Sequence, residues 1–87
     1  MISEADEDFW RLYASLPKDI QKAAKKAFRL FQQNPDHPSL LFKPLQGDSD
    51  FYSARINAKY RAVGQRDGAV IVWFWIGSHA DFDKEFS

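Results

Sequence analysis

The 87-residue sequence contains no cysteine. This absence excludes disulfide bonds and thiolate metal sites, and it fits a reducing compartment. The only two histidines, His37 and His79, lie far apart in the sequence. A zinc site would therefore need an unusual set of carboxylate ligands. We expect no metal ion and no other cofactor.

Long hydrophobic runs and targeting signals are absent as well. The run Ala69–Ile76 has eight apolar residues, whereas a membrane-spanning helix needs roughly 20. No basic segment followed by an apolar stretch opens the chain, so nothing indicates export and we expect a cytoplasmic protein without membrane contact. Because no repeat, low-complexity tract or linker interrupts the sequence, we expect residues 1–87 to form a single domain.

The net charge is zero, but the charges are unevenly distributed. Residues 1–10 carry four acids and no base, and residues 67–87 carry four acids and one base. The middle, residues 11–66, carries eleven bases and four acids and is therefore +7. Such a region can bind a polyanion, while the acidic ends can shield it or keep the protein soluble. The alternative for its lysine-rich part is a simple solvated helix face.

Two helices are predicted near the N-terminus. Asp6–Ser15 places apolar and aromatic residues three and four positions apart. Lys18–Gln33 follows helical spacing more closely, with apolar residues on one side and basic residues on the other. Ser15-Leu16-Pro17 separates the two, and here serine is expected to cap the second helix and proline to occupy its first turn.

Strands are predicted in the second half of the chain. Ser39–Leu45 indicates an edge strand, and Phe51–Ile56 and Tyr60–Gln65 indicate a hairpin. Ala69–Ile76 is too rich in β-branched and aromatic residues for a helix and indicates a central strand. The expected fold class is α+β, with two N-terminal helices on one face of a three- to four-stranded antiparallel sheet.

The register of the first hairpin follows from burial. A three-residue loop, Asn57–Lys59, pairs Ala54 with Ala62 and makes one sheet face apolar and small. A two-residue loop would instead bring basic residues onto that face, which costs desolvation energy. The three-residue loop is therefore predicted, and it places Arg55 beside Arg61 on the opposite face.

The second hairpin is predicted from Asp67-Gly68, a pair typical of two-residue turns. This turn pairs Ala62 with Trp73, so that Ile71, Trp73 and Trp75 would face the helices. The opposite face would carry Val70, Val72, Phe74 and Arg61.

Arg55 and Arg61 form the first candidate site. Two guanidinium groups on one sheet face repel each other unless an anion lies between them, and arginine matches phosphate oxygens well. The alternative is that both pair with acids, either in the 48–50 loop or at the C-terminus.

His79 is the second candidate, because it follows the central strand directly after Gly77-Ser78. An imidazole can accept or donate a proton near neutral pH, and beside arginines it would complete a phosphodiester-cleaving site. The alternative is a structural histidine that caps a turn through Asp81 or Ser78. Further basic residues expected to contact RNA are Lys22, Lys25, Lys26, Arg29, Lys43 and Lys59.

Six short segments of the sequence stand out together: Leu16–Gln21, Asn34–Pro35, Ser39–Leu40, Phe42–Lys43, Tyr60–Val63 and Trp75–Asp83. In this order they resemble the RelE/ParE superfamily of bacterial type II toxins. The resemblance implies helices packed on an antiparallel sheet, and the family's N-terminal strand is expected to be missing or very short here. RelE-type members are small ribonucleases that cleave mRNA in the ribosomal A site without a metal and are neutralised by an antitoxin.

The resemblance also implies roles for individual residues. Arg61 matches the family's phosphate-binding arginine, and Arg55 lies where relatives carry basic residues on the preceding strand. His79 matches the place of a catalytic arginine or histidine, with Gly77-Ser78-His79 similar to the YafQ-like branch. The leading hypothesis is a ribosome-dependent endoribonuclease toxin, with mRNA, the ribosome and an antitoxin as partners. The alternative is a ParE-like or inactive binding module that acts on a protein, which the acidic C-terminal segment favours.

Overall fold

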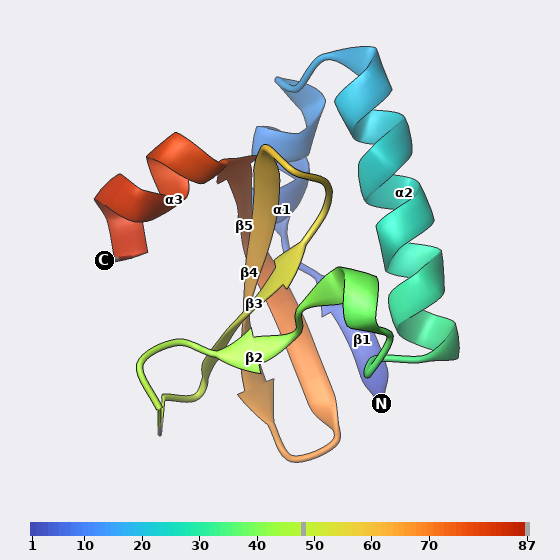
Figure 1. Ribbon diagram of the computed structural model, residues 1–87, viewed down its shortest axis with the longest axis vertical. Helices are drawn as coiled ribbons and strands as arrows, with labels where there is room; N and C mark the ends of the chain where they lie inside the picture. Colours follow the sequence, from blue (N-terminus) through green and yellow to red (C-terminus); the bar gives the residue numbers. More distant parts are fainter. Residues whose placement is uncertain (48, 87) are drawn as a thin grey trace.

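The computed structural model describes residues 1–47 and 49–86. A five-stranded sheet, in the order β1-β5-β4-β3-β2, separates α2 on one side from α3 on the other (Figure 1). In the described residues, no helix is long and apolar enough to cross a membrane. The elements are β1 (Ile2–Ala5), α1 (Glu7–Ala14), α2 (Lys18–Gln33), the 3-10 helix η1 (Pro38–Leu40), β2 (Lys43–Pro44), β3 (Phe51–Arg55), β4 (Tyr60–Asp67), β5 (Val70–Ser78) and α3 (His79–Phe86).

Both predicted N-terminal helices are present, and α2 has the predicted bounds. The Asp6 carboxylate caps α1 by accepting a hydrogen bond from the Phe9 amide at 3.0 Å. The predicted role of Ser15 is wrong: its hydroxyl donates to the Leu12 carbonyl at 2.7 Å and closes the end of α1. Pro17 occupies the N-cap position of α2, where no side chain caps the helix.

The sheet has one strand more than expected, because residues 2–5 form β1. β1 runs parallel to β5, so the sheet is mixed rather than wholly antiparallel. Backbone bonds from Ile2 to the Ala69 carbonyl (2.7 Å) and from Asp6 to the Trp73 carbonyl (3.0 Å) hold it in place. A buried strand such as β5 needs hydrogen-bond partners along both edges, and β1 supplies those that β4 does not. The α+β class is confirmed.

The predicted edge strand over residues 39–45 is much shorter in the structure. Pro38–Leu40 forms the 3-10 helix η1, and Leu41 then has a positive φ of 45°. The Nδ1 atom of His37 accepts a hydrogen bond from the Ser39 amide at 3.2 Å, which favours a helical turn over extended backbone. Only β2, Lys43–Pro44, remains as a strand, and it lies at the sheet edge as expected. Within the 48–50 loop, Asp48 lies outside the described residues.

The register between β3 and β4 is as predicted. Ala54 pairs with Ala62 and Arg55 pairs with Arg61, and the Ile56 amide donates to the Tyr60 carbonyl at 3.0 Å. Both alanines are buried. Burial of the small apolar face therefore selected the correct loop length from sequence alone.

The register between β4 and β5 differs from the prediction. Gly68 and Ala69 form the turn, and an irregularity at Val63/Gly64 shifts the pairing, so that Ala62 lies opposite Ile76 instead of Trp73. A bulge inserts one residue and reverses the alternation beyond it. Trp75 was predicted to join the core beneath α1 and α2, and this prediction is wrong. Its ring packs instead against Phe82 and Phe86 of α3.

The C-terminal helix α3 was not predicted. The Ser78 hydroxyl accepts a hydrogen bond from the Asp81 amide at 3.1 Å and caps its start. Phe82 and Phe86 are spaced by one helical turn and pack on Trp75 and Phe74. The serine followed three residues later by an acid, together with this aromatic spacing, was the signal that could have identified the helix.

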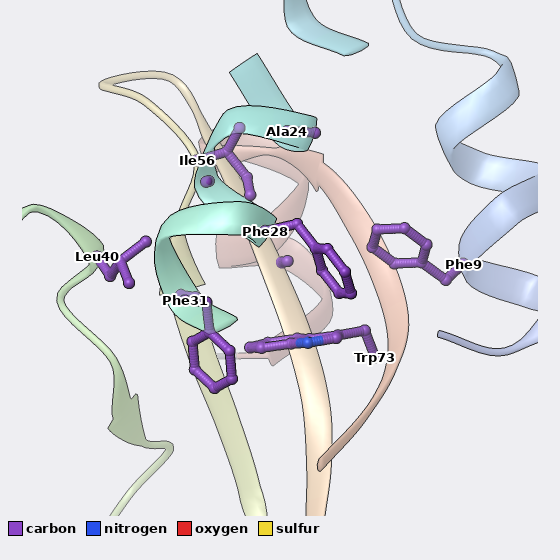
Figure 2. Close-up of a pocket in the computed structure, with 10 residues that line it drawn as sticks. Phe9, Ala24, Phe28, Phe31, Leu40, Ile56 and Trp73 are labelled. Atoms are coloured by element: carbon purple, nitrogen blue, oxygen red, sulfur yellow. The ribbon is translucent and has the colours of Figure 1, made fainter. Parts of the chain in front are cut away.

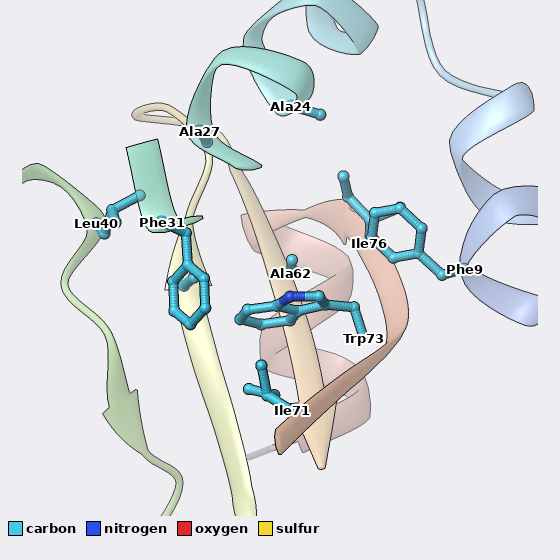
Figure 3. Packing of buried hydrophobic residues seen from close by; sticks show 10 residues of the cluster. Phe9, Ala24, Ala27, Phe31, Leu40, Ala62, Ile71, Trp73 and Ile76 are labelled. Atoms are coloured by element: carbon cyan, nitrogen blue, oxygen red, sulfur yellow. The ribbon is translucent and has the colours of Figure 1, made fainter. Parts of the chain in front are cut away.

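The core lies between the sheet and the first two helices, with the Trp73 indole at its centre (Figures 2 and 3). Phe31 of α2 meets this indole edge-on, with ring centroids 5.3 Å apart. The indole nitrogen donates to the Ser3 hydroxyl of β1 at 2.8 Å, so the polar atom of a buried ring is satisfied. The buried cluster is Phe9, Ala24, Ala27, Phe31, Leu40, Ala54, Ala62, Ile71, Trp73 and Ile76.

Gly64 gives a first testable prediction. A Cβ atom at this position would lie 2.9 Å from Ile71 Cγ1 and 2.9 Å from Trp73 Cε3, both in the core. Because these side chains are closely packed, Gly64→Ala is expected to lower the free energy of unfolding by about 1–3 kcal/mol. Urea denaturation measures the change, and Gln65→Ala at the next, exposed position is the control. Equal stability of the two variants would contradict this packing.

Candidate functional site

A hollow of about 360 Å³ opens on the α3 side of the sheet. We call it the Arg61–His79 hollow. It lies between β2 with its following loop, the strands β3 and β4, and α3. The residues that line it are Lys43, Pro44, Leu45, Gln46, Ser53, Arg61, His79, Phe82 and Phe86. It therefore brings three of the predicted site residues together.

Arg61 projects from β4 on the face opposite the buried Ala62. Its guanidinium carbon lies 5.8 Å from the centroid of the Phe82 ring. Within residues 1–47 and 49–86, neither Arg61 nor Arg55 forms an ion pair with a carboxylate. The alternative interpretation, in which both arginines are held by acids, therefore has no support among the described residues; Asp48, one of the acids of that interpretation, lies outside them.

His79 is the first residue of α3, and its backbone amide donates to the Lys59 carbonyl at 2.6 Å. Its Nδ1 atom lies 3.2 Å from Asp83 Oδ2, one helical turn along, and its side chain is 45% exposed. The proposed structural role through Asp81 or Ser78 does not describe these contacts, since Ser78 caps the helix and the imidazole faces Asp83. The imidazole lies on the same side of the sheet as Arg61, as the nuclease hypothesis requires.

Arg55 does not line this hollow. Although its backbone pairs with that of Arg61, Arg55 lines a second hollow of about 390 Å³ beside α2 and η1, together with Lys26 and Ser39. β3 ends at Arg55, and β2 pairs only with Tyr52 and Ser53, so β2 does not reach Arg55. The expected convergence of two arginines on one histidine is not observed, and Lys43 takes the place of the second cation.

The other predicted RNA-binding residues are divided between different surfaces. Lys59 is exposed in the loop between β3 and β4. The four α2 residues that were predicted to bind RNA, Lys22, Lys25, Lys26 and Arg29, are all exposed. Lys26 lines the hollow that contains Arg55, whereas Lys25 and Arg29 line a hollow on the α1 side of the helix. Lys22 lies one turn before Lys26. The basic face of α2 is thus two rows, not one.

Six of the nine lining residues were not predicted as site residues, and three of these six, Ser53, Phe82 and Phe86, stand out by burial or aromatic character. Ser53, which is 1% exposed, pairs with Lys43 across β2 and β3. The predicted register already placed it on the face of Arg61, so the signal was present. Phe82 and Phe86 enter the hollow because α3 folds back over the sheet, which depends on a helix that the sequence analysis missed.

This arrangement suits an anionic substrate that carries a planar group. Arg61 and Lys43 can stabilise negative charge on a phosphate, and the imidazole can transfer a proton. The two phenylalanine rings can stack on a nucleobase. No group of three or more His, Asp or Glu side chains in the described ranges could hold a metal ion.

The comparisons with known proteins give the family. A family model described as a ParE-like toxin domain matches residues 18–84. No curated protein sequence matches the chain.

Solved structures show the fold. A chain of the RelB-RelE antitoxin-toxin complex from Methanococcus jannaschii is 18% identical, with a TM-score of 0.75 over 97% of this chain and 99% of that chain. YafQ from E. coli strain BL21(DE3) is 15% identical, with a TM-score of 0.72 over 92% and 94%. A chain of the RelBE2 complex from Mycobacterium tuberculosis is 22% identical, with a TM-score of 0.71 over 90% and 96%. Because the family model covers most of the sequence and these structures share its architecture, the chain belongs to the ParE-like toxin domain family of the RelE/ParE superfamily.

Proposed function

We propose that this protein is a type II toxin that cleaves mRNA on the ribosome as a metal-independent endoribonuclease. The observation that carries the proposal is the Arg61–His79 hollow, in which a guanidinium without a carboxylate partner in the described residues, an imidazole and Lys43 surround one space. A phosphate in this hollow would contact both cations. The similar solved structures include YafQ and RelE toxins, whose fold this chain shares.

The chemistry that this hollow supports is cleavage of RNA by transesterification at phosphorus. The 2′-hydroxyl oxygen attacks the adjacent phosphorus, the bond to the 5′-oxygen breaks, and the products are a 2′,3′-cyclic phosphate and a 5′-hydroxyl. The proton of the 2′-hydroxyl leaves to a base, and the 5′-oxygen takes one from an acid. His79 serves as one of these groups. Arg61 and Lys43 stabilise the charge that builds up on the phosphate oxygens.

Asp83 fits this proposal as an orienting group. A carboxylate on Nδ1 fixes the position and tautomer of the imidazole and leaves Nε2 as the nitrogen that exchanges a proton with the substrate. Asp83 also adds negative charge near the proposed RNA site. Its orientation of the imidazole should raise the cleavage rate, whereas its repulsion of RNA phosphates should lower it.

A protein partner is part of the proposal. The RelB-RelE and DinJ-YafQ structures are toxin-antitoxin complexes. We propose that a cognate antitoxin neutralises this chain in the cytoplasm, where ribosomes and mRNA are found.

The second candidate is a ParE-like module that inhibits a protein target, or an inactive relative. It is favoured by the description of the matching family model. It is also favoured by α3, where Asp81, Asp83 and Glu85 are exposed next to the hollow and oppose a polyanion.

The experiment that tests the proposal maps mRNA 5′ ends after the purified protein is added to translating ribosomes, with ribosome-free RNA in parallel. Cuts that follow the codon phase, appear only with ribosomes and persist in EDTA are expected. The His79→Ala protein is the negative control. Absence of any cut in this assay, together with growth inhibition when the protein is expressed in cells, would favour the second candidate instead.

Ribosome binding should depend on the lysine row of α2 that lies next to Arg55. Each phosphate contact contributes about one to the slope of log affinity against log salt, and Lys22 and Lys26 each supply one cation. The double variant Lys22→Ala/Lys26→Ala is therefore expected to lower this slope by about two. Sedimentation with ribosomes at several salt concentrations measures it, with Arg11→Ala on α1 as the control. An unchanged slope would show that Lys22 and Lys26 do not contact ribosomal RNA.

A further inference from the structure

Ser53 lies in the middle of β3, where it lines the Arg61–His79 hollow although it is almost completely buried. Among residues 1–47 and 49–86, it is the only buried polar residue. A buried hydroxyl that finds no hydrogen-bond partner costs free energy, so such side chains are nearly always paired. The partner of the Ser53 hydroxyl is therefore a question about the hollow itself.

The Ser53 hydroxyl has no hydrogen-bond partner in the part of the chain that the structure describes. Val63, its partner residue on β4, is apolar and fully buried and offers no side-chain acceptor. In the same part of the chain, no side-chain oxygen or nitrogen is sealed from the surface without a partner. The small surface that Ser53 retains therefore lies at its hydroxyl oxygen, which opens into the hollow.

Two cations flank this hydroxyl on the same face of the sheet. Lys43 of β2 pairs directly with Ser53, and side chains paired in this way have Cβ atoms about 4.5–5.5 Å apart. Arg61 lies two residues before Val63, so it is a diagonal neighbour of Ser53, about 7–8 Å away. All three polar residues line the hollow. An anion held between the ammonium and guanidinium groups would therefore lie over the hydroxyl.

A phosphate group fits this arrangement better than the edge of a nucleobase does. The non-bridging oxygens of a phosphodiester only accept hydrogen bonds, and Lys43 and Arg61 only donate them. Most base edges present donors as well as acceptors, and two flanking cations would leave those donors without a partner. Because a serine side chain is short, its hydroxyl reaches only a group that enters between the two cations.

We infer that the Ser53 hydroxyl binds the scissile phosphate and donates a hydrogen bond to one of its two non-bridging oxygens, between Lys43 and Arg61. As the 2′-hydroxyl oxygen attacks, negative charge builds up on that oxygen and the hydrogen bond becomes stronger. Ser53 keeps its own proton, so it stabilises charge and is neither acid, base nor nucleophile. This inference rests on the proposed function and adds to it a neutral donor at the reacting phosphate.

Sulfur substitution in the mRNA tests the inference. Two synthetic mRNAs carry sulfur in place of one or the other non-bridging oxygen at the cleaved linkage, and single-turnover cleavage on stalled ribosomes is measured. Ser53→Ala is expected to cleave the all-oxygen mRNA about 10–100-fold more slowly than the wild type. Sulfur is a weak acceptor, so one of the two isomers should be cleaved slowly by the wild type, and Ser53→Ala should lose that selective defect.

The control is Ser15→Ala, which removes an exposed hydroxyl outside the hollow and should keep the wild-type rate and sulfur response. If Ser53→Ala cleaves at the wild-type rate, or keeps the wild-type response to both sulfur isomers, the inference is overturned. A change of codon preference with an unchanged sulfur response would assign Ser53 to a base, which also overturns it.

A binding measurement separates failure of this inference from failure of the proposed function. Inorganic phosphate is titrated into the full chain at constant ionic strength and followed by NMR, and it is expected to bind about tenfold more weakly to Ser53→Ala. Equal affinities would overturn the inference whether or not mRNA is cleaved. Weaker phosphate binding by the variant, together with a wild type that cuts no mRNA, would refute only the nuclease.

A second variant keeps the test valid if alanine disturbs the buried position. Ser53→Cys nearly preserves the size of the side chain but replaces the hydroxyl with a thiol, which is a weak donor. It should therefore lose cleavage rate and phosphate affinity as Ser53→Ala does. Thermal unfolding of both variants shows whether the fold is intact, and a Ser53→Cys protein with wild-type cleavage and phosphate binding would overturn the inference.

Discussion

Replacing Arg61 with alanine is expected to lower the rate of mRNA cleavage by about 10²–10³-fold, the usual cost of removing one group that stabilises transition-state charge. Arg61 lines the same hollow as His79, and its guanidinium has no carboxylate partner in the described residues that would neutralise it. Arg61→Lys should recover only part of the rate, because an ammonium group cannot make two parallel hydrogen bonds to a phosphate.

Single-turnover cleavage on stalled ribosomes measures this loss apart from binding. Arg66→Ala is the matched control, since Arg66 also projects from β4 but contacts the Tyr52 ring at 5.2 Å and the Gly68 carbonyl at 2.9 Å instead of lining the hollow. If Arg61→Ala cleaves at the wild-type rate while Arg66→Ala does not, the site has been placed on the wrong part of β4.

The parts of the fold that sequence predicted well are those governed by local pattern and burial. The apolar spacing predicted α2 itself. The proline just before it and Asn34-Pro35 just after it predicted its two ends. The β3–β4 register followed from a single choice, because only one loop length buried Ala54 and Ala62 together. Such features need no knowledge of distant residues.

The parts that failed depend on distant contacts. β1 pairs with the edge of β5 that β4 leaves free. The alternation of β5 is reversed by an irregularity at Val63/Gly64, and its one local signal is Gly64, since an isolated glycine within a strand suggests a bulge. The shift moved Trp75 to the α3 side, where the ring lies over Gly77: a Cβ atom there would come within 2.7 Å of the indole. Gly77, which the sequence analysis took only as the end of the strand, therefore also leaves the room that the Trp75 indole occupies.

The candidate site shows the same division. Strand alternation was enough to place Arg61 opposite the helices, and the end of β5 was enough to bring His79 to the same side. It was not enough for Arg55, which pairs with Arg61 in the sheet but lines the hollow beside α2 and η1 and not the Arg61–His79 hollow. β2 is too short to reach Arg55.

His79→Ala is expected to slow cleavage by about 10²–10⁴-fold, the range that a positioned acid or base contributes. The fold should be unaffected, since the hydrogen bond from residue 79 to the Lys59 carbonyl uses the backbone and alanine suits the first turn of a helix. The variant also loses the contact between His79 and Asp83. Because both side chains are about half exposed, this contact contributes little to stability. Cleavage rates and thermal unfolding should therefore be measured on the same preparation.

The role of His79 can be decided by comparing the cleavage rate and stability of His79→Ala with those of Asp83→Ala and His37→Ala. If the imidazole only stabilises α3 through its contact with Asp83 in the same helix, then Asp83→Ala and His79→Ala should reduce activity to a similar extent, because each removes that contact. If it transfers a proton, His79→Ala should lose far more rate than Asp83→Ala, with unfolding temperatures alike. His37 caps η1 by accepting a hydrogen bond from the Ser39 amide and does not line the Arg61–His79 hollow, so His37→Ala should cleave at the wild-type rate. Equal losses in the first two variants would leave the hollow without its proposed acid or base and would favour the protein-binding alternative.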